Sequence, residues 1–388
     1  MLGIAASLGL LLAAGEALRW NAAAEVQARG RDEPGGTGAG RSGLAELDLH
    51  GQLGLSPQWP DGAATLIWSP SLLLRQAVSG APETTGNVTR HLGRVELRAR
   101  LAPATRLISR TSVDWGLTDF SPLSGQVSPP IVGPLPAQRF VHTLGVETML
   151  DFTHAFSRRL ELSVGAGVQR SGGIGHDAVS VLPFQVGPQA TASVTWAADR
   201  RNTLTFLGSG SESRFSNGIT SVLSSLEADW RFRASRHTLL DAAGGLMVVR
   251  SWGPDFSSRG TYGSGALGAA WDLPVAPQRA LRTSLRLRLV PGVDRVTALA
   301  LLAVRAEGNA ELTEGRLRLG VSGSEGHIIS GAALGADELR LEARSSWVAA
   351  HGWAPEVRMS AARTNQLPFA GWQFQALVGL RWADQGLL

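Results

Sequence analysis

The feature that most constrains the fold of this chain is an alternation of apolar and polar residues that recurs along nearly its whole length. In residues 18–29 the even positions are all apolar and the odd positions nearly all polar. Near the other end, Trp372, Phe374 and Val378 alternate in the same way with Gln373 and Gln375. A strand places successive side chains on opposite faces, whereas a helix has a period of 3.6 residues. The alternation therefore predicts strands with one apolar face each.

The segments that carry this pattern number about 18, with 16 as the alternative count, and each has about 10 to 15 residues. This is near the length that a tilted strand needs to cross a bilayer. We therefore predict an all-β fold, a transmembrane antiparallel up-and-down β-barrel. The approximate spans are 18–29, 44–56, 63–77, 92–102, 104–117, 140–153, 158–171, 188–198, 202–213, 219–233, 237–251, 260–273, 279–290, 297–309, 314–324, 338–349, 355–365 and 371–383.

The predicted links alternate between tight and long. Residues 101–104, 154–157, 197–200 and 234–237 are tight, and longer links lie between them. Outer-membrane barrels have short periplasmic turns and longer external loops, so this parity predicts an even strand count with both chain ends on the periplasmic side. Three segments are candidates for a loop that narrows or closes the lumen, because long loops without strands are often functional. They are the Pro-rich segment 119–139 and the segments 172–187 and 322–337.

The first 17 residues resemble a secretory signal, since an apolar run from Leu2 to Ala14 precedes the small residues Gly15 and Ala17. The run is shorter than the ~20 apolar residues of a transmembrane helix. No later stretch reaches ~18 uninterrupted apolar residues, and an exported chain that spans a membrane without such a helix must do so as a closed barrel. We predict a signal-like segment at 1–17 and one barrel domain at 18–388.

Two soluble β-architectures are disfavoured. Strands of a β-sandwich usually have five or six residues, and oily outer faces on nearly every strand would aggregate in water. A propeller needs a blade repeat of ~40 residues with its signature, which the sequence lacks. The Trp residues add weak support for a membrane barrel, because many fall near strand ends or on apolar faces, as in an interfacial belt.

Taken together, these segments resemble the bacterial outer-membrane β-barrels, the porin-like class, from Leu18 to Ala383. Trp382 looks like the aromatic residue that this class presents to the barrel assembly machinery, although Ala383 to Leu388 follow it. In size and style the chain is also similar to the large barrels associated with polysaccharide secretion in Gram-negative bacteria. The resemblance implies a location in the bacterial outer membrane, with membrane lipid and the assembly machinery as partners.

A search for reactive motifs is mostly negative. The chain has no Cys, which excludes thiolate metal sites, cysteine nucleophiles and disulfides. Residues 263–268 match GxGxxG, but no helix start follows, so no dinucleotide site is predicted. The eight His are scattered. His50, His142 and His176 keep a metal site or a membrane-embedded hydrolase open only as minor alternatives, and we predict neither an enzyme nor a cofactor.

The residues that carry chemistry are Arg on the predicted inner face, accompanied by Asp and Glu. One interpretation is a lattice of cross-strand ion pairs that stiffens the wall. The other is a water-filled bore with positive bias, since rings of Arg favour anions, and both can hold together. The Arg form no basic segment, so no nucleic-acid partner is expected. The predicted pore-lining residues are Arg94, Glu96, Arg98, Arg100, Asp229, Arg231, Arg233, Arg286, Arg288, Arg316, Arg318, Arg340, Glu342, Arg344, Arg358 and Arg381.

The sequence therefore predicts an outer-membrane channel or secretion conduit with an Arg-rich lumen, for anionic solutes or polysaccharide. A barrel of 16 to 18 strands leaves an aqueous channel, unlike an eight-stranded barrel, which its own side chains fill. The alternative is a barrel closed by loops and charge pairs that serves as a structural or adhesion scaffold.

Overall fold

The structure is a computed structural model. It describes most of the chain from Ala17 onward, with gaps at several links. The described residues are 17–34, 41–79, 87–120, 123, 140–254, 257–276, 278–294, 297, 299–331, 335–349, 352–366 and 370–387. The predicted signal-like segment lies almost entirely outside them and stays a prediction.

Eighteen strands and one short helix make up the described fold. The first nine strands are β1 (Ala17–Pro34), β2 (Arg41–Trp59), β3 (Gly62–Ser79), β4 (Val88–Ala102), β5 (Thr105–Asp119), β6 (Phe140–Ala155), β7 (Leu160–Gly173), β8 (Gln185–Ala197) and β9 (Asn202–Phe215). The others are β10 (Thr220–Arg233), β11 (Thr238–Trp252), β12 (Ser257–Ala276), β13 (Arg279–Val293), β14 (Ala300–Glu314), β15 (Leu317–Gly331), β16 (Asp337–Trp347), β17 (Trp353–Thr364) and β18 (Gly371–Leu387). The helix α2 (His176–Val181) lies between β7 and β8.

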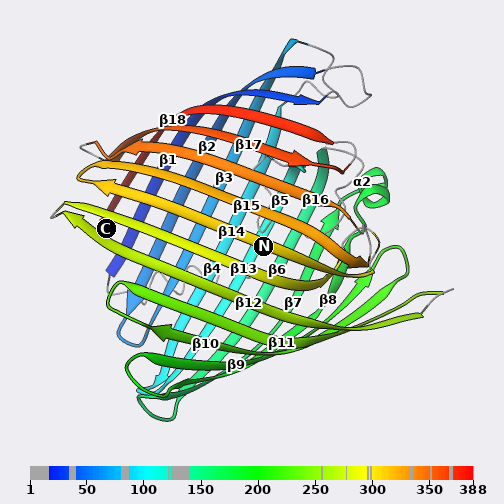
Figure 1. Ribbon diagram of the computed structural model, residues 1–388, viewed down its shortest axis with the longest axis vertical. Helices are drawn as coiled ribbons and strands as arrows, with labels where there is room; N and C mark the ends of the chain where they lie inside the picture. The colour runs from blue at the N-terminus through cyan, green and yellow to red at the C-terminus, as the bar shows by residue number, and fades with distance from the viewer. Residues whose placement is uncertain are drawn as a thin grey trace.

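The strands form one closed antiparallel barrel. Each strand pairs with its neighbour in the chain, and β1 pairs with both β2 and β18, which closes the wall. Figure 1 shows the strands running obliquely around the wall. In the closing pair, Glu25 lies opposite Arg381 and Arg29 lies opposite Leu377. The predicted fold class and strand count are confirmed.

The links also follow the predicted parity. One rim carries links of two to five residues, at 60–61, 103–104, 156–159, 198–201, 234–237, 277–278, 315–316 and 348–352. The opposite rim carries links that are longer on the whole, at 35–40, 80–87, 120–139, 174–184, 216–219, 253–256, 294–299, 332–336 and 365–370. The first residues of β1 and the last of β18 pair with each other at the short-turn rim. By the general rule for outer-membrane barrels, we expect this rim to face the periplasm.

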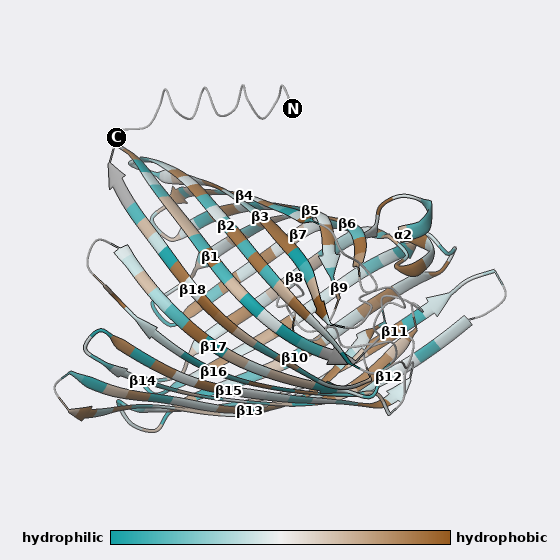
Figure 2. Cartoon of the chain, turned by 90° about the horizontal axis from the view of Figure 1, so that it is seen from above, coloured by the Kyte–Doolittle hydropathy of each residue, from teal (hydrophilic) through white to brown (hydrophobic). Residues whose placement is uncertain are grey.

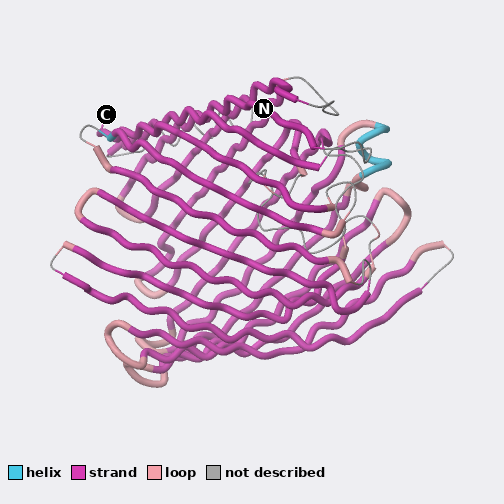
Figure 3. The backbone as a smooth tube through the Cα atoms, turned by 45° about the horizontal axis from the view of Figure 1, so that its top comes forward, coloured by secondary structure: helices cyan, strands magenta, loops and turns pink. Residues whose placement is uncertain are grey.

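Two predicted loops are corrected by the structure. Most of the segment 322–337 is strand, because β15 continues to Gly331 while paired with β14 and β16. The segment 172–187 includes strand residues at both ends and the helix α2, which stands at the rim in Figure 3. Of the Pro-rich segment 119–139, Asp119 ends β5, and only Phe120 and Leu123 of the rest are described.

The outer face of the barrel is apolar. Along the strands, hydrophobic and hydrophilic residues alternate, as the brown and teal bands of Figure 2 show. Large apolar side chains such as Leu226, Leu246 and Leu267 are exposed in mid-strand, which suits lipid as the surrounding solvent. No helix among the described residues has the length and apolar character needed to span a bilayer.

Buried apolar clusters occur where links fold against the long-link rim. Phe120, Val141 and Leu182 form one cluster, against which Ala178 and Val181 of α2 pack. Leu301, Ala303, Ile328 and Ala336 form another at the ends of β14 and β15.

Candidate channel lumen

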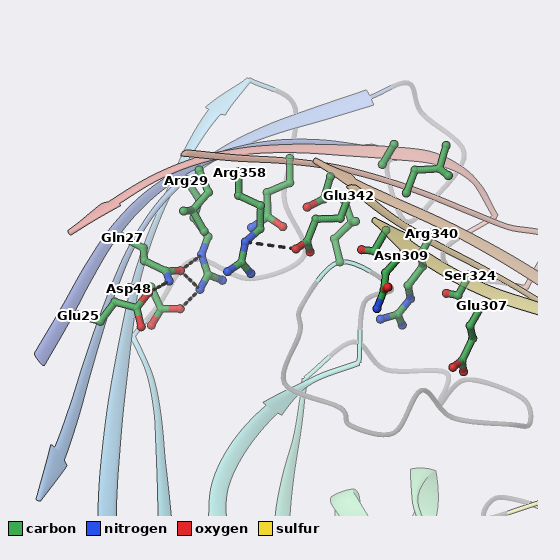
Figure 4. Close-up of a pocket in the computed structure, with 18 of the residues that line it drawn as sticks. Glu25, Gln27, Arg29, Asp48, Glu307, Asn309, Ser324, Arg340, Glu342 and Arg358 are labelled. Atoms are coloured by element: carbon green, nitrogen blue, oxygen red, sulfur yellow. Dashed lines mark hydrogen bonds and ion pairs between the residues drawn. The ribbon is translucent and has the colours of Figure 1, made fainter. Parts of the chain in front are cut away.

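The inner faces of ten strands enclose a cavity of about 940 Å³. These strands, β13 to β18 and β1 to β4, are consecutive around the ring because β18 pairs with β1. Figure 4 shows the labelled residues extending from this wall into the cavity. Hydroxyl and amide groups are frequent in the lining, among them Ser69, Ser71, Ser284, Asn309, Ser322, Ser324, Ser360, Gln27 and Gln375. The alternation of each strand delivers them, because every second residue faces inward.

Four of the predicted pore-lining residues line this cavity: Arg286, Arg340, Glu342 and Arg358. Arg358 lies 2.6 Å from Glu356 and 3.6 Å from Glu342. Arg340 pairs with Glu338, and Arg286 lies 3.4 Å from Asp241. These guanidinium groups therefore enter the cavity with their charge already compensated.

Other predicted residues form similar pairs on the inner face. Glu96 stands at the centre of one group, where it pairs with Arg98 and lies 3.2 Å from Arg94 and 3.4 Å from Arg110. Arg231 lies 3.4 Å from Asp229 on β10, and Arg344 lies 3.8 Å from Glu356. An ion-pair lattice, one of the two interpretations of the sequence, is thus present in the geometry.

The remaining predicted Arg lack such partners and lie mostly near the short-turn rim. Within the described part of the chain, Arg100, Arg233, Arg288, Arg318 and Arg381 form no ion pair with a carboxylate. All but Arg288 are close to short turns or to the end of β18. Arg316 was predicted to lie on a strand, which is wrong, because it occupies the tight turn between β14 and β15. Unpaired positive charge therefore concentrates at the short-turn end of the lumen.

A buried ionic network lies near the opposite rim. The sequence did not predict that its members contact one another. Arg75 Nε lies 2.8 Å from Glu46, Arg31 lies 3.5 Å from Glu46, and Arg31 Nη1 lies 3.1 Å from Asp119 Oδ2. These four side chains are almost completely buried, with exposures of 0 to 2%. Glu46 alternates with Leu47 in the sequence, which is consistent with its inward direction, but nothing local in the sequence links it to Asp119.

This network shows that the end of β5 turns inward after it separates from β4. The last β4–β5 pair is Arg90 with Gly116, whereas Asp119 still pairs with Phe140 of β6. Neighbouring strands lie about 4.8 Å apart, so β1 and β5 are separated by roughly 19 Å or more along the wall. The direct contact between Arg31 and Asp119 requires the end of β5 to bend across the inner faces of β1 to β3. Phe140, at the start of β6, follows it, with its ring 4.4 Å from the Arg75 guanidinium. Leu123 lines the cavity itself.

Residues 10–388 match the model of the EpsX exopolysaccharide export family. The chain belongs to this family. No curated protein sequence matches it. The closed barrel with its apolar outer face, in a member of an export family, is a porin-like protein of the bacterial outer membrane.

Solved structures similar to this EpsX-family barrel include proteins of Acinetobacter baumannii and Pseudomonas aeruginosa. OccAB4 of Acinetobacter baumannii has 8% identity and a TM-score of 0.49, with 96% of this chain and 99% of that chain covered. The outer membrane protein OpdK of Pseudomonas aeruginosa has 12% identity and a TM-score of 0.46, with 95% and 99% covered. OccK3 of the same organism has 12% identity and a TM-score of 0.45, with 97% and 98% covered. The likeness is one of overall barrel form.

The His residues raised by the sequence lie on different elements of the EpsX-family barrel. His50 faces the lumen, 2.9 Å from Asp48, and His142 is an exposed residue on β6. His176 begins α2 at the long-link rim. No group of three metal-ligating side chains is placed to hold a metal ion among the described residues. The absence of catalysis stays a prediction.

Proposed function

We propose that this barrel is a conduit through which exopolysaccharide crosses the outer membrane. The observation that carries the proposal is the lumenal cavity of about 940 Å³, lined by hydroxyl, amide and ion-paired side chains from ten strands. Membership of an exopolysaccharide export family supports the same conclusion.

The lining suits a hydroxylated polymer that must keep moving. Ser, Asn and Gln side chains exchange hydrogen bonds with sugar hydroxyls as they do with water. Guanidinium groups such as Arg358, already held by Glu356 and Glu342, offer further donors without a strong net field. Conduction requires sites that are favourable enough to enter and weak enough to leave, and a wall of many modest partners meets this requirement.

The charge distribution supports a weak preference for anionic polymer or solute. The unpaired Arg100, Arg233, Arg318 and Arg381 lie near the periplasmic entrance, where they raise the local concentration of anions. Deeper in the lumen the ion pairs balance the charge. On this proposal, the Arg at the entrance select for anions, and the polar cavity lets the polymer pass.

Cysteine substitution tests the conduit directly, because the chain has no Cys of its own. Ser322 lines the cavity, whereas the adjacent Val321 is 62% exposed on the apolar outer face. We expect a bulky, water-soluble thiol reagent to label Ser322→Cys and to reduce both single-channel conductance in planar bilayers and polysaccharide release from cells. Val321→Cys, treated identically, is the matched control.

The same pair of variants separates the conduit from the closed scaffold. If Ser322→Cys is labelled in a correctly inserted barrel without any effect on conductance or release, the conduit is wrong. A barrel that conducts no ions in either variant, while its cells still display polymer, would favour the scaffold.

A further inference from the structure

Three successive short turns on one side of the periplasmic rim share a sequence and a geometry. They are Phe156-Ser157-Arg158-Arg159, Ala198-Asp199-Arg200-Arg201 and Ala234-Ser235-Arg236-His237, and each ends in two residues with basic side chains. They join β6 to β7, β8 to β9 and β10 to β11, so they form one continuous arc. The other described short turns carry no such pair. We call these three turns the basic arc.

The second residue closes each turn in the same way. The backbone N–H of Arg159 donates to Ser157 Oγ at 3.1 Å, that of Arg201 donates to Asp199 Oδ1 at 2.6 Å, and that of His237 donates to Ser235 Oγ at 3.0 Å. Because the third and fourth positions follow the same closure, the basic side chains take equivalent positions in all three turns.

The only carboxylate within these turns is occupied by the turn itself. Asp199 accepts the backbone N–H groups of Arg201 and Asn202 and the side-chain amide of Asn202. The hydrogen bond from Arg201 is the largest of the influences that lower the pKa of Asp199. The five Arg are exposed, and none forms an ion pair with a described carboxylate. Their guanidinium groups are available to an external anion.

Each turn has an outward-facing Trp next to it, which contacts or pairs with the residue that follows the turn. Trp196 pairs with Leu160, which follows Arg159, and Trp271 pairs with Thr238, which follows His237. Trp230 donates its Nε1–H to Asn202 Oδ1 at 3.0 Å, and Asn202 follows Arg201. Trp196 and Trp230 are 45% and 42% exposed on the apolar face. Trp side chains settle at the level of lipid headgroups, so the Arg just beyond them reach the phosphate layer.

From this arrangement we infer that the basic arc binds the headgroups of anionic phospholipids in the periplasmic leaflet. Arg side chains beside a membrane attract anionic lipid additively, and five of them on three adjacent turns make a substantial patch. The lipid would bind at one sector of the rim, because the basic pairs lie on the turns of three neighbouring hairpins. This partner is independent of what passes through the lumen.

Native mass spectrometry of the intact barrel tests the inference, with phosphatidylglycerol and phosphatidylcholine offered in equal amounts. We expect the wild type to retain phosphatidylglycerol preferentially. Replacing Arg158, Arg159, Arg200, Arg201 and Arg236 by Ser should lower that preference roughly tenfold or more. Asp199→Asn, which removes the one negative charge, should raise it. The charge-matched control replaces five rim Arg outside the basic arc by Ser: Arg100, Arg106, Arg233, Arg318 and Arg381.

Several outcomes would overturn the inference. One is an equal loss of phosphatidylglycerol in the control and in the arc variant. Another is an arc variant that keeps its lipid but loses binding to polygalacturonate, which would make the arc a polymer site. Displacement of the lipid by millimolar inorganic phosphate would show a simple anion site. Double substitution of Arg200 and Arg201 alone, expected to give an intermediate loss, covers the case in which the fivefold variant does not fold.

Discussion

Glu46 illustrates how single residues hold charge inside this wall. Its carboxylate lies between Arg75 and Arg31, and Arg31 also reaches Asp119. Removing one partner of a buried ion pair leaves an uncompensated charge, which costs more than the pair contributes. The network therefore fixes the inward bend of β5 as much as it stabilises the strands that carry it.

The substitution Glu46→Ala should lower the free energy of unfolding by about 3–5 kcal/mol, because it removes a buried carboxylate that both Arg75 and Arg31 contact. Glu212 pairs with Arg214 at 2.6 Å in an exposed position, so Glu212→Ala should cost less than about 1 kcal/mol. Denaturant unfolding of both variants in lipid vesicles makes the comparison. Equal losses would show that the network carries no special stability.

At the scale of the strand, alternation was enough to predict the elements, because each wall strand meets lipid on one face and polar side chains on the other. The prediction of element boundaries failed where the local composition favours a loop but pairing with neighbouring strands holds the segment as strand. The segment 322–337 was a candidate loop beyond a strand predicted to end at 324, yet pairing with β14 and β16 continues β15 through its Ser- and Gly-rich residues to Gly331. Arg316 was misplaced because the alternating pattern continues through a two-residue turn.

An added charge should have different effects on the two faces of one strand, lowering stability on the outer face and conductance on the inner face. Leu285 on β13 is 60% exposed on the outer face, and its neighbour Ser284 lines the cavity. Leu285→Arg should destabilise the barrel by about 2–4 kcal/mol near the middle of the bilayer. Ser284→Arg should change stability little and reduce conductance instead. Unfolding in vesicles and planar-bilayer recording, applied to both variants, test this reversal.

The site was less predictable than the strands. The inward direction of Arg340, Arg358 and Glu342 followed from alternation, because direction is a local property of a strand. Two of their partners, Glu338 and Glu356, lie only two residues away on the same strand. The approach of Arg358 to Glu342 depends instead on the register between β16 and β17. The contact between Arg31 and Asp119 depends on the path of β5 after it separates from β4, which no local pattern encodes.

At the scale of the whole molecule, charge is distributed unevenly between the rims. Replacing Arg100, Arg233, Arg318 and Arg381 by Ser should bring the ratio of anion to cation permeability toward one, because these groups pair with no carboxylate among the described residues. The balanced double variant Arg358→Ser with Glu356→Ser removes one charge of each sign and should leave the ratio unchanged. Reversal potentials in asymmetric salt give the ratio, and an unchanged value in the fourfold variant would place selectivity elsewhere.

The pairing of β1 with β18 makes the barrel a ring, and a ring has no natural first strand. Removing residues 371–388 should prevent insertion, because the freed edges of β1 and β17 would expose unpaired N–H and C=O groups to lipid, at several kcal/mol each. A circular permutant with Ala17 joined to Leu387 through a short linker and new ends at 103–104 keeps every pairing and should insert. Membrane fractionation distinguishes the two. The order of strands along the gene is then separable from their order around the ring.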